Sequence, residues 1–162
     1  MKGWLALTVF GGGVAQATLA PALRIGGVAP DIPLIVVVLL ALRGGPEVGA
    51  LAGFAAGLLQ DVTGGAPVGA QALTKAVVGF ALGTLGTRLA VRHPLVQVPG
   101  LVLLSVAEGV ARYALLALFR FPAPFGELMV YVVLPQALYN GFLGAALVLF
   151  LAWTDAHRSP TS

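Results

Sequence analysis

The sequence predicts an all-α membrane protein, a helical bundle of about six transmembrane helices. Of the 162 residues, 59% are hydrophobic and only 9% are charged, whereas a soluble domain carries roughly 25% charged residues. The mean hydropathy of +0.98 is an average over the whole chain, so the apolar character is not confined to a single anchor. The apolar runs are continuous rather than alternating, which argues against the strands of a membrane barrel.

Six apolar segments are candidates for the roughly 20-residue helices that cross a hydrocarbon core. They cover approximately residues 4–19, 31–43, 46–61, 70–90, 95–119 and 127–153. A glycine pair and Pro46 separate the short second segment from the third, so we expect these two to form a tight, shallow or tilted hairpin. No polar stretch is long enough for a second domain. Residues 1–162 are therefore predicted to form one integral membrane domain.

The N-terminal segment has two interpretations. Lys2, the apolar run after it and Ala15-Gln16-Ala17 resemble a secretory signal peptide with its cleavage site. The apolar run continues past that site to Leu19, and the chain beyond it is also hydrophobic. We therefore expect a retained first transmembrane helix.

The basic residues predict the orientation of the chain in its membrane. With the N-terminus in the cytoplasm, five basic residues lie inside and two lie outside. The inner residues are Lys2, Arg43, Arg88, Arg92 and Arg158, and the outer ones are Arg24 and Arg120. This asymmetry predicts cytoplasmic N- and C-termini. The bases are scattered, so we interpret the net charge of +3 as a topology signal and expect no nucleic-acid partner.

Nothing in the sequence indicates an enzyme, a metal site or a cofactor. Cysteine is absent, which excludes disulfides, thiolate metal sites and cysteine nucleophiles. His93 and His157 lie far apart near segment ends, and are more typical of surface histidines than of metal ligands. The chain lacks a phosphate loop, a His-Glu metal spacing and a nucleophile elbow.

One helix face is lined with glycine. Gly49, Gly53 and Gly57 follow one another at a spacing of four, so they lie on the same side of the third segment and allow another backbone to approach closely. One interpretation is packing against a neighbouring helix of the same chain. The alternative is a groove for the helix of a partner protein.

Several polar side chains fall inside the predicted spans, where charge is costly and is expected to be paired and turned inward. They form a predicted polar interior of Lys75, Glu108, Arg112, Gln136 and Asn140. Glu108 and Arg112 are four residues apart and can neutralise each other on one helix, while Lys75 needs Asp61 or Glu108 from elsewhere. This interior is either a ligand or ion site, or polar contacts that hold the helices together.

The third segment and the loop after it carry a motif in which Gly53, Gly57, Asp61, Gly65 and Gly69 recur at intervals of four. With Pro30 upstream and Pro135, Tyr139, Asn140 and Gly141 downstream, the chain resembles the MreD family, the membrane component of the bacterial rod-shape system, or elongasome. The resemblance extends over essentially the whole chain.

This resemblance implies a non-enzymatic scaffold of peptidoglycan elongation. It implies binding to the bitopic protein MreC, with RodA and a penicillin-binding transpeptidase in the same complex and an indirect link to MreB filaments. A second hypothesis is a substrate-binding subunit of an energy-coupling vitamin transporter, because such subunits are similar to this chain in size, six-helix organisation and apolar composition. The polar interior supports this alternative. The lack of tryptophan outside the chain ends, at Trp4 and Trp153, weakens it.

Overall fold

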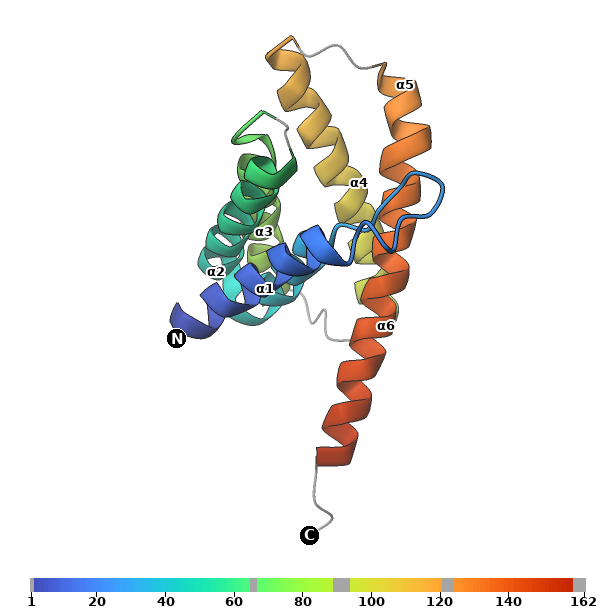
Figure 1. Cartoon of the computed structure of the whole chain (residues 1–162). Helices are drawn as coiled ribbons and strands as arrows, with labels where there is room; N and C mark the ends of the chain where they lie inside the picture. Colours follow the sequence, from blue (N-terminus) through green and yellow to red (C-terminus); the bar gives the residue numbers. More distant parts are fainter. Residues whose placement is uncertain (1, 65–66, 89–93, 121–123, 159–162) are drawn as a thin grey trace.

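The computed structural model describes residues 2–64, 67–88, 94–120 and 124–158, and the secondary structure in these ranges is helical. The elements are α1 (Lys2–Thr18), α2 (Ile32–Gly64), α3 (Ala70–Arg88), α4 (Pro94–Leu118), α5 (Phe125–Leu128), the π-helical turn η1 (Met129–Val133) and α6 (Leu134–Arg158). The last three follow one another without a break as one long rod (Figure 1). The predicted all-α class is confirmed.

The helix α2 reverses direction at Gly45. The backbone of Gly45 is non-helical, with φ 81° and ψ −170°, a conformation that favours glycine. The Nε2 of Gln60 donates to Oδ1 of Asp31 at 3.1 Å, so the two ends of the element meet. A Cβ built on Gly49 lies 2.8 Å from the Cβ of Ala41. The element is therefore a hairpin of a first arm (residues 32–44) and a second arm (residues 46–64), as expected from the sequence.

The helices form two groups, which we call the N-terminal group (α1, α2 and α3) and the C-terminal group (α4, α5, η1 and α6). Within the first, α3 packs along both arms of α2 and α1 packs on α2; within the second, α4 packs against α6. The groups meet mainly where α3 contacts α4, with smaller contacts of α2 to α4 and α6 (Figure 1). We call this boundary the seam.

Aliphatic clusters fill the interior of both the N-terminal group and the seam. Val9, Val37, Leu40, Ala52 and Ala56 are buried together, which brings α1 and both arms of α2 into one core. A second cluster of Ile35, Val38 and Leu101 lies at the seam. In lipid such contacts act through close packing rather than through removal of apolar surface from water.

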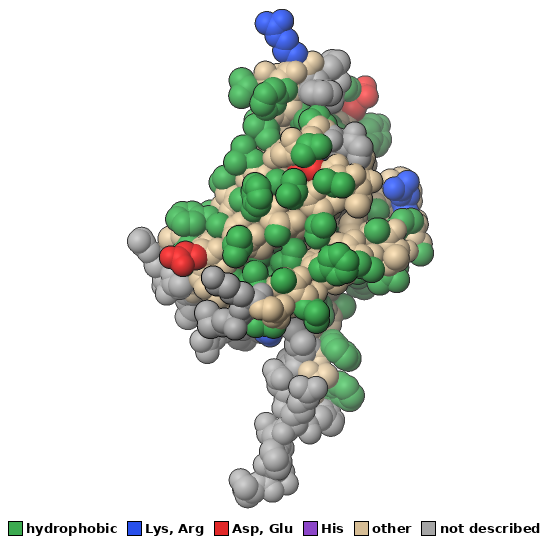
Figure 2. Space-filling model, turned by 60° about the vertical axis from the view of Figure 1, so that its left-hand side comes forward, with side chains coloured by type: hydrophobic (Ala, Val, Ile, Leu, Met, Phe, Trp, Pro, Cys, Tyr) green, Lys and Arg blue, Asp and Glu red, His purple; other side chains and the backbone are tan. Residues whose placement is uncertain are grey.

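Three helices in the described ranges are long and apolar enough to cross a membrane: Ile32–Gly64, Val98–Leu118 and Phe125–Leu147. The first of these stretches is the hairpin, whose first arm of 13 residues is only about 20 Å long. The count of about six crossings thus stays a prediction. The outer surface is rich in hydrophobic side chains, and Figure 2 shows them spread over the face that comes forward in that view, with few charges between them.

The C-terminal rod changes its winding before Pro135. A proline removes a donor from the helix, and the π-helical turn at Met129–Val133 lies directly upstream. There the N–H of Leu134 bonds to the carbonyl of Met129, five residues earlier. The turn therefore sets the rotation of α6, whose first turns carry Gln136 and Asn140 into contact with the segment just before α2.

Candidate functional site

Lys75 lies at the centre of a buried charge network on the seam. Its side chain has an exposed fraction of 0%. The Nζ lies 2.8 Å from Oδ2 of Asp31 and 3.3 Å from Oε1 of Glu108, and it donates to Oε1 of Gln71 at 2.6 Å. An ammonium carries three N–H donors, so these three acceptors satisfy it fully. One cation thus joins α3 to both the start of α2 and the middle of α4.

Asp31 holds three elements together at the start of α2. Its Oδ1 accepts from the backbone N–H of Leu34 at 3.0 Å, which is an N-cap contact, and also accepts from Gln60 on the second arm. Its own N–H donates to Oδ1 of Asn140 on α6 at 2.8 Å. Asp31 is not among the site residues that the sequence predicts. An acid directly before an apolar helix signals an N-cap, but not an ion pair with Lys75.

Glu108 pairs across the seam rather than along its own helix. Its Oε1 accepts from Lys75 and from Oγ1 of Thr74 at 3.3 Å. The expected neutralisation by Arg112 is not formed, because the Nη1 of Arg112 donates instead to Oε1 of Gln71 at 3.3 Å. The two ion pairs in the described ranges both use Lys75. Spacing four along a helix permits a contact, but the tertiary partner is closer.

The helix α6 adds neutral hydrogen bonds to the network. The Nδ2 of Asn140 donates to Oγ of Ser105 on α4 at 3.1 Å. The Nε2 of Gln136 donates to the carbonyl of Ala29 at 3.0 Å, and the hydroxyl of Tyr139 donates to the carbonyl of Leu23 at 2.7 Å. Lys75, Glu108 and Asn140 therefore meet around Asp31, whereas Gln136 lies at the edge, against the segment between α1 and α2.

Asp61 organises the start of α3 and does not pair with Lys75. Its two carboxylate oxygens accept from the backbone N–H groups of Gly69 at 2.8 Å, Gln71 at 3.1 Å and Ala72 at 3.1 Å. The first N–H groups of a helix have no partner within the helix, and a carboxylate there is also stabilised by the helix dipole. Gly69 has a φ of 104°, which glycine tolerates. Gly65 of the motif lies outside the described residues.

The glycine face of the second arm is covered by α3 of the same chain. A Cβ on Gly49 would meet the backbone of Gly79, and one on Gly53 would meet the backbone carbonyl of Lys75. A Cβ on Gly57 would meet the carbonyl of Gln71 in the same way. The face therefore packs within the chain and leaves no room for the helix of a partner. Its close approach also fixes the depth of α3, and so places Lys75 between the two acids.

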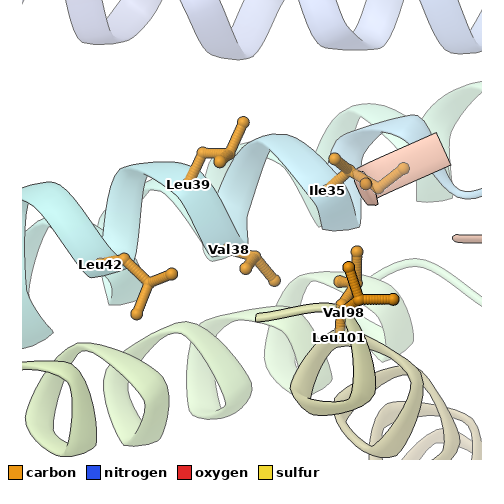
Figure 3. Close-up of a pocket in the computed structure, with 7 residues that line it drawn as sticks. Ile35, Val38, Leu39, Leu42, Val98 and Leu101 are labelled. Atoms are coloured by element: carbon orange, nitrogen blue, oxygen red, sulfur yellow. The ribbon is translucent and has the colours of Figure 1, made fainter. Parts of the chain in front are cut away.

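The seam beside the network is apolar and tightly filled. Ile35, Val38, Leu39 and Leu42 of the first arm face Val98, Leu101 and Gly144 of the C-terminal group around a cavity of about 20 Å³ (Figure 3). A cavity of this size is close to that of one water molecule, and its lining offers no polar partners. The network and these aliphatic contacts together hold the first arm of α2 and α3 against the C-terminal group.

The described ranges contain no cluster of three or more His, Asp or Glu side chains that could hold a metal ion. His93 and Arg92 lie outside the described residues, and so does the side chain of His157. Lys75, Asp31 and Glu108 pair with one another at the seam and so connect the helices that carry them.

The described part of the chain is all-helical, has membrane-length apolar helices and pairs the buried Lys75 with Asp31 and Glu108, which defines a helical membrane protein. The family model for the rod shape-determining protein MreD matches residues 2–153, nearly the whole chain. The chain belongs to the MreD family, and its role is in rod-shape determination. Comparison with curated proteins and with solved structures finds no match.

Proposed function

We propose that this chain is a multi-pass scaffold of the cell-shape machinery in the bacterial cytoplasmic membrane, with both termini in the cytoplasm. It binds MreC, lies in one complex with RodA and a penicillin-binding transpeptidase, and helps to couple MreB filaments to cell-wall synthesis. The observation that carries this proposal is the family match over residues 2–153.

The packing of the chain supports a scaffold. Lys75, Asp31 and Glu108 are satisfied by groups within the chain, so the network links the two helix groups without needing a ligand. Because α3 occupies the glycine face, the helix of a partner has to bind the outer apolar surface instead. The end of α4, just before Arg120, lies at the opposite end of the molecule from the end of α6 (Figure 1), which agrees with an outer Arg120 and a cytoplasmic end of α6.

The test is affinity purification of the tagged full chain from native membranes in mild detergent, with the partners identified by mass spectrometry. An unrelated tagged polytopic protein at the same expression level is the control. Recovery of MreC together with cell-wall synthases supports the scaffold. Absence of MreC from a preparation in which the chain remains folded refutes it.

The second candidate is the substrate-binding subunit of a small-molecule transporter, favoured by the polar groups on the seam. A vitamin needs a pocket of several hundred Å³ with a few fixed polar groups. The cavity between the first arm of α2 and the C-terminal group is about 20 Å³ and aliphatic, which is too small. A larger cleft of about 440 Å³ between α3 and α4 has no polar side chain among its lining residues, which also disfavours this function. If it is nonetheless right, the purification recovers cytoplasmic ATPases with a coupling subunit, and neutralising Lys75 and Arg112 together abolishes ligand binding.

A further inference from the structure

Arg112 is a cation in a membrane-length helix and makes no direct ion pair with a carboxylate of the described residues. It lies in the apolar stretch Val98–Leu118 and is partly buried. Its one hydrogen bond runs from Nη1 to Gln71 at 3.3 Å, although a guanidinium carries five N–H donors. Most of these donors therefore remain available.

The acids around Arg112 are already engaged. Asp31 and Glu108 both pair with Lys75, and Asp61 accepts three backbone N–H groups of α3 and its approach. Among the described residues, no ion pair within 4.0 Å includes Arg112. Arg112 acts on Asp31 only through space, without a direct contact, so its guanidinium is open to direct binding of an anion from outside the chain.

An apolar cleft of about 440 Å³ opens between α3 and α4 beside Arg112. It is lined by Pro67, Val68, Gly69, Ala70, Leu73, Leu115, Leu116 and Phe119. Arg112 precedes Leu115 and Leu116 by three and four residues, so it lies on the same face of α4. Its partner Gln71 directly follows Ala70 on the other wall. Arg112 and Gln71 are therefore not lining residues themselves, but they lie next to the lining residues of the two walls, at the edge of the cleft.

The depth of this site suits a lipid headgroup. Arg112 is six residues before the end of α4 at Leu118, a distance of about 9 Å along the helix. Gln71 lies in the first turn of α3. Below this level α3 presents the exposed side chains of Leu73, Val77 and Phe80, which continue the apolar wall of the cleft.

We propose that the cleft between α3 and α4 binds an anionic phospholipid, with its phosphate on the guanidinium of Arg112 and its acyl chains against the apolar walls. Arginine and phosphate form charge-assisted, often bidentate hydrogen bonds. A lipid with net negative charge fits better than a zwitterionic one, because no ammonium competes with Arg112 for the phosphate. This site is independent of the proposed scaffold function.

The test uses the full chain in detergent and native mass spectrometry, with phosphatidylglycerol and phosphatidylethanolamine of identical acyl chains. The wild type should retain phosphatidylglycerol preferentially, and Arg112→Gln should weaken that binding about tenfold, the effect of losing one charge-assisted contact. Arg43→Gln removes the same charge from an exposed residue next to the break in α2, outside the cleft, and should bind like the wild type. Equal binding by Arg112→Gln and the wild type overturns the proposal.

Two further experiments test the cleft itself and separate a lipid from other anions. Leu116→Trp fills the cleft but keeps Arg112, and should weaken phosphatidylglycerol binding even if Arg112→Gln does not fold. Phosphatidylglycerol affinity equal to that of the wild type in Leu116→Trp overturns the site. Inorganic phosphate should not displace the lipid at equal concentration. Displacement by inorganic phosphate would show that Arg112 binds a small anion instead of a lipid. If the wild type binds neither lipid, the remaining candidate ligand of Arg112 is a carboxylate of a partner protein. Either result rejects the lipid site.

Discussion

Replacing Lys75 with methionine should destabilise the chain more than any other single neutralisation at the seam. The substitution keeps a long side chain but removes the ammonium, which leaves Asp31 and Glu108 buried without a cation. Both acids have an exposed fraction of 2%. Removing one partner of a buried pair typically costs about 3–5 kcal/mol, because the remaining charge has neither water nor a counter-ion.

The expected shift can be measured as a melting temperature. For soluble domains of this length 1 kcal/mol corresponds to about 2–4 °C, so a loss of about 3 kcal/mol lowers the midpoint by roughly 6–12 °C. The assay is thermal unfolding of the full chain in dodecyl maltoside, followed by helical circular dichroism. Arg112→Met is the matched control. It removes a cation that is only partly buried and makes one 3.3 Å hydrogen bond, so its shift should be smaller.

A triple variant separates unpaired charge from lost packing. Lys75→Met with Asp31→Asn and Glu108→Gln removes all three charges while keeping the N-cap acceptor on residue 31 and the acceptor for Thr74. It should melt above the Lys75→Met single variant, because replacing both sides of a buried pair is far less costly than removing one. The reasoning is refuted if Lys75→Met shifts the midpoint by less than the ~2 °C expected for 1 kcal/mol, or if the triple variant melts no higher than the single one.

Three more substitutions test how the fold holds Lys75 in place, each by thermal unfolding in the same detergent. Gly53→Ala should lower the midpoint, because its Cβ meets the carbonyl of Lys75, whereas Gly11→Ala, whose Cβ meets nothing within 4 Å, should not; equal midpoints would contradict the close packing. Asp61→Ala should cost about 1–3 kcal/mol by leaving three N–H groups without their acceptor, and should speed proteolysis between α2 and α3; unchanged cleavage would argue against the cap. Gly45→Ala should cost about 1–3 kcal/mol because of the positive φ, and a neutral result would mean that the reversal does not need this backbone conformation.

Asp31 marks the limit of sequence-based prediction at the site. The sequence identified Lys75 as a buried cation without a local partner, and Glu108 was one of the two acids proposed for it. From the local sequence, Asp31 is predicted only to be the residue before an apolar helix. Its ion pair with Lys75 and its contacts with Gln60 and Asn140 depend on the reversal at Gly45 and on the position of α6. Asp61 shows the converse, because it was proposed as a partner for Lys75 but caps α3 instead.

The glycine motif shows the same division. A spacing of four predicts a smooth helix face, since 3.6 residues per turn bring these positions to one side. The spacing does not indicate which backbone packs against that face. In the structure it is the backbone of α3. The pairing of Glu108 with Arg112 was wrong for a related reason. Helical spacing indicates which contacts are permitted, whereas the neighbouring helix decides which of them forms.

The sequence by itself determined the helical class, the membrane environment and the hairpin, because hydropathy, glycine and proline act through local physics that needs no tertiary partner. It also carried the motif of the MreD family. Only the tertiary structure decided that Lys75 lies between Asp31 and Glu108, that α3 covers the glycine face, and that Arg112 makes a hydrogen bond to Gln71 instead of an ion pair. These outcomes depend on which helices lie side by side. Buried charges take the nearest partner in space, and that partner can be distant in sequence.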